Sequence, residues 1–152
     1  MSKPLLVGLI AVVVGAGAFV FTNTSSSQEV IVYKSPTCAC CAKWITHMEE
    51  AGYKITVRDT NDMQPIKMQH GIQRRAQSCH TAIVDGYVVE GHVPAEFVTR
   101  MLEEKPDIKG IAVPGMPQGS PGMEGPNPVD YDVVALGKDG KASLYGSVKA
   151  GS

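Results

Sequence analysis

Short β-branched runs alternate with amphipathic segments along the middle of the chain. The runs Glu29–Lys34 and Tyr53–Arg58 are rich in valine, isoleucine and tyrosine, which predicts two strands. Between them, Ser35-Pro36-Thr37 breaks the first strand, and Thr37 is a natural helix N-cap. A helix over residues 38–51 is predicted because apolar side chains recur there at helical spacing: Cys41, Trp44, Ile45, Met48 and Ala51.

The next segment of the chain predicts one hairpin between two helices. A weaker helix is expected at Met63–His70, and strands at Cys79–Val84 and Tyr87–Glu90 flank the turn dipeptide Asp85-Gly86. A further helix at Ala95–Glu104 begins after a proline. The predicted order is β-α-β-α-β-β-α. It indicates an α/β fold in which a strand–helix–strand unit is followed by an antiparallel hairpin, the thioredoxin-like arrangement.

The composition of the sequence changes after residue 105. Residues 111–128 are rich in proline and glycine and predict a long irregular segment, which in a compact domain is usually functional or disordered. Residues Tyr131–Leu136 and Ala142–Val148 flank Lys138-Asp139-Gly140 and predict a terminal β-hairpin. We therefore expect a thioredoxin-like metal-binding domain at residues 29–105 and a C-terminal extension at 106–152.

The first 28 residues differ from the rest of the chain. After Lys3, the segment Leu5–Phe21 is an uninterrupted apolar or glycine run, and a polar tract follows it. This pattern predicts either a signal peptide, cleaved near Ala16-Gly17-Ala18, or an uncleaved N-terminal membrane anchor. Both alternatives place the working domain outside the cytoplasm.

The charge balance argues against one class of partner. The chain has 14 basic and 15 acidic side chains and no run of lysine or arginine. Proteins that bind nucleic acid normally carry a basic face that neutralises phosphates. We therefore expect no nucleic-acid partner.

Three of the four cysteines form the motif Cys38-Ala39-Cys40-Cys41 at a strand-to-helix junction. Such close cysteines restrain the unfolded chain little, so a structural disulfide is a poor explanation. A thiolate is stabilised at a helix N-terminus, and thiolates serve both as redox nucleophiles and as metal ligands. A dithiol oxidoreductase needs Cys38 and Cys41 alone, whereas a soft metal gains from Cys40 as well.

The predicted topology brings more ligands to this motif. The first strand ends there, so an antiparallel third strand begins there and the fourth ends there. Cys79 and His92 should then converge on the motif. His80 follows Cys79 on the predicted strand, so its side chain should point to the opposite face.

Two methionines stand in the glycine- and proline-rich segment. Met116 and Met123 are unusual there because methionine normally fills cores. Thioethers favour Cu(I), so a loop that reaches back over the site could supply ligands. The loop contains little apolar surface, and we expect copper to order it.

Taken together, these motifs resemble the CopG-type periplasmic copper-resistance proteins. The resemblance rests on Cys-x-Cys-Cys followed by Trp44, on Ser78–Ala82, on Gly91–Pro94 and on Val113–Met123. It implies a thioredoxin-like domain with a C-terminal extension, a periplasmic location, copper bound near the Cys-x-Cys-Cys motif and a part in copper detoxification.

The sequence therefore predicts a periplasmic copper-binding protein for copper resistance, with a Cu(I)/Cu(II) redox role as an inference from thioredoxin-like chemistry. We expect the cofactor to be copper, bound as Cu(I) in a polynuclear site. The expected redox pair is Cys38 and Cys41. The expected partners are copper efflux or other periplasmic copper-handling proteins, and the inner membrane if the N-terminal segment is uncleaved. Two alternatives stay open: a thiol-disulfide oxidoreductase and a passive copper chaperone. The predicted metal ligands are Cys38, Cys40, Cys41, Cys79, His92, Met116 and Met123.

Overall fold

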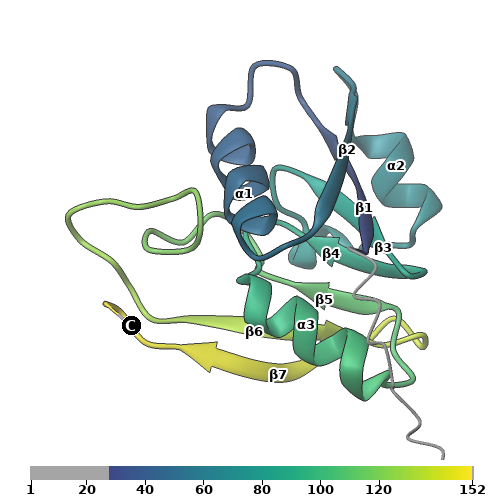
Figure 1. Cartoon of the computed structure of the whole chain (residues 1–152). Helices are drawn as coiled ribbons and strands as arrows, with labels where there is room; N and C mark the ends of the chain where they lie inside the picture. Colours follow the sequence, from purple (N-terminus) through teal and green to yellow (C-terminus); the bar gives the residue numbers. More distant parts are fainter. Residues whose placement is uncertain (1–27, 152) are drawn as a thin grey trace, which may run out of the picture.

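The computed structural model describes residues 28–151, which form a seven-stranded mixed sheet with three α-helices (Figure 1). The predicted signal peptide or anchor lies outside these residues, apart from Gln28. No helix within the described range is long and apolar enough to cross a bilayer. In chain order the elements are β1 (Glu29–Lys34), α1 (Ala39–Glu50), β2 (Lys54–Asp59), α2 (Gln64–Gln69), the 3-10 helix η1 (Arg74–Ala76), β3 (Thr81–Val84), β4 (Tyr87–Glu90), α3 (Ala95–Glu104), β5 (Gly110–Ala112), β6 (Tyr131–Leu136) and β7 (Ala142–Val148).

Strand β1 lies inside the sheet, whose order is β2-β1-β3-β4-β5-β6-β7. It runs parallel to β2 and antiparallel to β3, and β3 pairs with β4 through a hairpin. Asp85 and Gly86 form the turn with φ of 48° and 80°, as tight hairpin turns require. The end of β1, the start of β3 and the end of β4 consequently lie at the same edge of the sheet.

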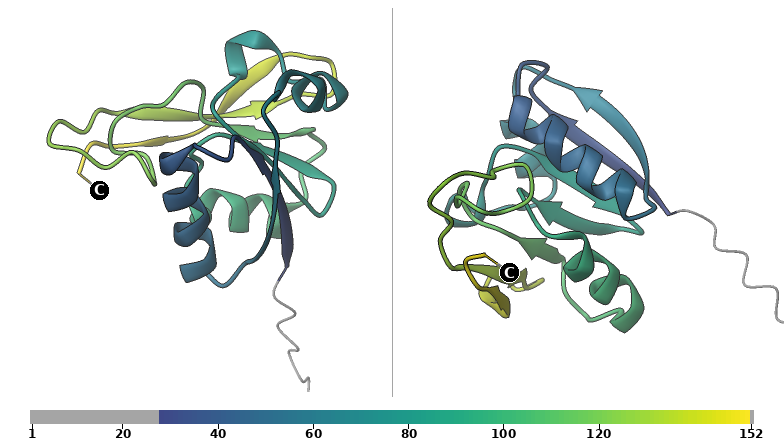
Figure 2. Two further views of the ribbon diagram at one scale, coloured as in Figure 1. Left: turned by 90° about the horizontal axis from the view of Figure 1, so that it is seen from above. Right: turned by 60° about the vertical axis from the view of Figure 1, so that its left-hand side comes forward.

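The helices cover the two faces of the sheet unequally. Helices α1 and α3 lie on one face and α2 on the other (Figure 2). The main core between α1, α3 and the sheet includes Trp44, Met48 and Met101, all fully buried. Val88 and Ala112 point to the other face, where a smaller cluster packs around Ile72.

The C-terminal extension continues the same sheet. The prediction of an irregular chain from residue 111 was wrong at its start, because β5 pairs parallel with β4 at Gly110–Ala112. A three-residue strand is too short to show a period in the sequence. Strand β6 pairs antiparallel with β5 and with β7. The fold is mixed α/β; the thioredoxin-like assignment and the predicted division near residue 105 stay predictions.

Gly110 is expected to be essential for the pairing of β5 with β4. A Cβ on Gly110 would lie 1.9 Å from the backbone oxygen of Val88, so the strands would have to separate. Gly110→Ala should lower the free energy of unfolding by about 1–3 kcal/mol, the usual range for overpacking. Urea unfolding followed by circular dichroism measures this change.

Gly125→Ala is the matched control. Its new Cβ would meet the side chain of Gln118, which can move away. Equal stability of the two variants would show that the sheet tolerates a side chain at Gly110.

Candidate metal centre

The cysteine motif lies where β1 passes into α1. Helix α1 begins at Ala39, with Cys38 at the N-cap position and no side chain capping it. The prediction that Thr37 caps this helix was therefore wrong. Cys38 is held instead by its backbone, since its N–H donates to the carbonyl of Ser35 at 3.1 Å. The first-turn amides of α1 are left without a side-chain cap, and they favour negative charge on nearby sulfurs.

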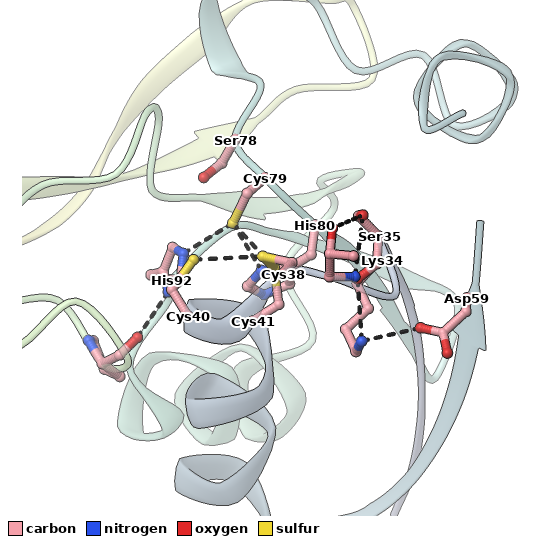
Figure 3. Close-up of a disulfide and its surroundings, with 12 residues drawn as sticks. Lys34, Ser35, Cys38, Cys40, Cys41, Asp59, Ser78, Cys79, His80 and His92 are labelled. Atoms are coloured by element: carbon pink, nitrogen blue, oxygen red, sulfur yellow. Dashed lines mark hydrogen bonds and ion pairs between the residues drawn. A yellow bond between two sulfur atoms is a disulfide. The ribbon is translucent and has the colours of Figure 1, made fainter. Parts of the chain in front are cut away.

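A second segment brings Cys79 and His92 to the same place, so the predicted convergence is confirmed (Figure 3). Cys79 precedes β3, and His92 follows β4. The Sγ atom of Cys79 lies 3.4 Å from Sγ of Cys41 and 2.9 Å from Nε2 of His92. The antiparallel pairing of β3 with β1 and β4 produces this meeting.

The cysteine cluster is present in a half-oxidised form. Cys38 and Cys41 form a disulfide, while Cys40 and Cys79 are free thiols. The free thiols touch the disulfide from both ends: Sγ of Cys40 lies 3.4 Å from Sγ of Cys38, and Cys79 contacts Cys41 at the same distance. Cys41 is fully buried, whereas the other three are partly exposed. The Cys38–Cys41 pair is thus the oxidised part of the cluster, and Cys40 and Cys79 are the reduced part.

His92 is oriented by the loop that follows β5. Its Nδ1 donates a hydrogen bond to the carbonyl of Pro121 at 2.8 Å. That bond directs Nε2 toward the thiol of Cys79. A neutral imidazole with a free Nε2 is the form that ligates metals.

His80 also faces the cluster, contrary to the sequence prediction. Strand β3 begins at Thr81, so Cys79 and His80 precede the strand and do not follow its alternation. Nδ1 of His80 lies 3.3 Å from Sγ of Cys79, and the ring packs 4.4 Å from that of Trp44. His80 is fully buried, and no group among residues 28–151 hydrogen-bonds its Nε2.

Burial keeps this part of the site uncharged. It raises the pKa of the Cys79 thiol to about 12, and Cys40 adds to the shift. Burial likewise lowers the pKa of His80 well below its usual value, with smaller effects from His92 and Lys67. Burial also lowers the pKa of His92. Metal binding at Cys79 would therefore release its proton.

The glycine- and proline-rich loop is anchored on the site at two points. Gly115 donates its N–H to the carbonyl of Gln77 at 3.1 Å, beside Ser78. Gly122 lies so close to α1 that a Cβ there would be 2.6 Å from the carbonyl oxygen of Cys40. Met116 and Met123 each directly follow one of these glycines. Met116 is 53% exposed and Met123 partly buried, and their role as ligands stays a prediction.

The loop also carries its own hydrogen bonds, which the sequence analysis did not foresee. Met123 and Ser120 are joined through their backbones at 2.8 Å, and the hydroxyl of Ser120 donates to the carbonyl of Pro117 at 2.7 Å. Glu124 accepts the N–H of Gly122 at 2.6 Å, and its other oxygen faces Lys43. The loop is thus held in part by contacts of its own, and its further ordering by copper stays a prediction.

A buried charge pair that the sequence pattern did not predict lies behind the cluster. Lys67 of α2 and Glu90 of β4 form an ion pair, and both side chains are almost completely buried. Glu90 stands at an inward position of a predicted strand, immediately before Gly91-His92. A carboxylate within a predicted strand was the one feature of the sequence that could have indicated a buried ion pair, because charged residues are rarely buried unless they are paired.

The arrangement suits a soft metal. The four cysteine Sγ atoms lie within 4.8 Å of one another, and so do the ligand atoms of Cys79, His80 and His92. Thiolate, imidazole and thioether donors select Cu(I) or Zn²⁺ over hard ions. With Cys38 and Cys41 reduced, the cluster thus offers four sulfurs that could hold a soft metal.

Comparison with known proteins gives one family and two structures. The family described as "Protein of unknown function, DUF411" matches residues 76–123. A solved structure titled "Copper resistance protein copG- Form 2" is 43% identical, with a TM-score of 0.76, and the match covers 80% of this chain and 98% of that one. A structure titled "Copper resistance protein copG- Form 1" is 42% identical, with a TM-score of 0.75 and the same coverage. No curated protein sequence matches the chain.

The raised pKa of Cys79 predicts slow alkylation. Because the thiolate is the nucleophile, the rate with iodoacetamide should rise about tenfold per pH unit from about pH 8 to about pH 10. An unperturbed thiol, with a pKa of about 8.5, levels off within that range. Peptide mass spectrometry of the disulfide form measures the rate at Cys79 separately from Cys40. A plateau near pH 9 would contradict the burial argument.

Proposed function

The chain belongs to the CopG family of copper resistance proteins, and we propose that it binds copper as Cu(I) in a cysteine-ligated site and serves copper resistance. One observation carries this proposal: the Sγ atoms of Cys38, Cys40, Cys41 and Cys79 lie within 4.8 Å of one another. Four sulfurs from two chain segments form a donor set that a soft cation fits. The titles of the two similar structures name copper resistance for those proteins, which agrees with this chemistry.

The reduced site would take more than one copper ion. Cu(I) is satisfied by two or three soft ligands, and a thiolate can bridge two ions. Four thiolates, the imidazole of His92 and the thioethers of Met116 and Met123 exceed what one ion needs. The two anchors of the loop support the thioether role, since each methionine follows an anchored glycine.

The disulfide supports a redox role beside copper binding. Oxidation of the Cys38 and Cys41 thiols forms one S–S bond and releases two electrons and two protons. Two Cu(II) ions take one electron each and become Cu(I), and the protons pass to solvent. The reverse exchange consumes two protons and returns the thiols. Cys40 and Cys79 keep their sulfurs free in the disulfide form.

We propose that this chemistry takes place in the periplasm. The protein would be exported through the segment at residues 1–28 and held at the inner membrane if that segment stays uncleaved. Its partners would be copper efflux or other periplasmic copper-handling proteins. Residues 29–105 would form a thioredoxin-like domain, and the extension at 106–152 would supply the methionine loop and end in a β-hairpin.

A second candidate function is thiol-disulfide exchange with protein substrates. The Cys38–Cys41 disulfide at the start of α1 favours it, because a pair at a helix N-terminus is suited to exchange. In that function Cys40 and Cys79 would be dispensable.

The reduced protein is expected to bind more than one Cu(I) per chain, and the disulfide form fewer. The disulfide removes two of the four thiolates from the cluster. An anaerobic titration against a chromophoric Cu(I) chelator measures both stoichiometries. Quenching of Trp44, the one tryptophan in the chain, reports binding at the site because its ring contacts His80.

Cys40→Ser separates the two candidate functions. It should lower the Cu(I) stoichiometry of the reduced protein while leaving reduction of a model disulfide by Cys38 and Cys41 intact. Thr46→Ser, on the exposed side of α1, is the matched control and should change neither quantity. Saturation of the reduced parent protein at one equivalent would contradict the polynuclear site. Absence of Cu(I) binding, with exchange intact, would instead support the oxidoreductase.

A further inference from the structure

The ion pair between Lys67 and Glu90 lies directly behind the cysteine cluster. The Lys67 and Glu90 side chains are 3% and 0% exposed. Burying two charges is costly, and an apolar pair of the same volume is often at least as stable. The pair is therefore poorly explained by fold stability, and its contacts indicate what else it does.

The carboxylate of Glu90 holds both residues that flank Cys79-His80. Its Oε1 accepts the backbone N–H of Ser78 at 2.7 Å, and its Oε2 accepts the hydroxyl of Thr81 at 2.6 Å. Lys67 bonds Oε1 and also donates to the hydroxyl of Thr81 at 3.2 Å. One side chain thus fixes the chain immediately before Cys79 and immediately after His80.

The Cys79-His80 dipeptide has little other support from the sheet. It precedes β3, so the β1–β3 pairing begins after it, at Thr81. One backbone bond reaches it, from the N–H of Gly91 to the carbonyl of His80 at 3.0 Å. The side chains of the dipeptide are held as well, by packing of the His80 ring on Trp44 and by the contact of Cys79 with His92. Hydrogen bonds to a charged group are stronger than neutral ones, so the Glu90 carboxylate is the strong restraint on the backbone that flanks the dipeptide.

We propose that Glu90, held and charge-balanced by Lys67, is a positioning residue that keeps Cys79 within reach of Cys41. Its relevance to copper rests on the function proposed above. The geometric claim is independent of copper: without the carboxylate, the 78–81 segment moves and the 3.4 Å contact between the Cys41 and Cys79 sulfurs is lost. Glu90 itself touches neither sulfur in the contacts of residues 28–151.

The test uses a disulfide that forms without metal. In a Cys38→Ser/Cys40→Ser background, Cys41 and Cys79 are the remaining cysteines. Oxidised glutathione should join them, forming one S–S bond and releasing two reduced glutathione molecules. The exchange has two steps: one thiol attacks oxidised glutathione, which gives a mixed disulfide and one reduced glutathione, and the other thiol then attacks the mixed disulfide and releases the second. The rate of this second, intramolecular step, followed by mass spectrometry, reports how often the two sulfurs meet. Adding Lys67→Met and Glu90→Gln together, which leaves no unpaired buried charge, should slow it by at least about tenfold, the scale of one lost hydrogen bond to a charged group.

Thr81→Val gives a milder variant in the same background. It keeps the shape of the side chain and the ion pair but removes the hydroxyl that bonds Oε2, so it should slow the reaction by about threefold or more. Thr99→Val is the matched control, since its hydroxyl bonds Tyr53 on the exposed side of α3, and it should react at the parent rate. Near-ultraviolet circular dichroism and the thermal midpoint establish which variants are folded.

Slower intramolecular closure of the Cys41–Cys79 disulfide in a folded variant, with the Thr99 control unchanged, supports the positioning role. Closure at the parent rate in folded Thr81→Val or in the folded double variant overturns it. If the double variant does not fold, Thr81→Val decides. A protein that passes this test but binds no Cu(I) would refute the copper function and leave the positioning role standing.

Discussion

The antiparallel pairing of β3 with both β1 and β4 is the constraint on which the site depends. It places the end of β1, the start of β3 and the end of β4 at one edge of the sheet. Cys38, Cys79 and His92 are separated widely in the sequence, yet each stands at one of these three strand ends. A slip of this register would move Cys79 away from Cys41, so the pairing of the sheet determines the composition of the cluster.

Two layers of support surround the cluster. On the outer side, the loop after β5 orients His92 through the carbonyl of Pro121 and rests on α1 at Gly122. On the inner side, Glu90 and Lys67 hold the segment that carries Cys79. The donor atoms are thus fixed by neighbours that are not themselves donors, and hydrogen bonds of this kind orient the ligands of known metal sites.

Much of this could be predicted from the sequence, because strong local signals coincide with the site. The β-branched run Glu29–Lys34, the helical spacing in α1 and the Asp85-Gly86 turn predicted the elements, and the order of the elements predicted the meeting of Cys79 and His92 with the motif. The orientation of His80 could not be predicted, because it depends on β3 beginning at Thr81 and not at Cys79. The contacts of Glu90 with Ser78 and Thr81, and the anchors of the loop, are tertiary, and no local period encodes them.

X-ray absorption spectroscopy at the copper edge tests the central claim, that the four sulfurs act as one donor set for copper, most directly. The reduced protein loaded with Cu(I) should show a first shell dominated by sulfur and a copper–copper scattering path, because thiolates shared between ions bring the ions close together. The same measurement on Cys40→Ser should show the copper–copper path weakened. A first shell of nitrogen and oxygen with no copper–copper path would contradict the account.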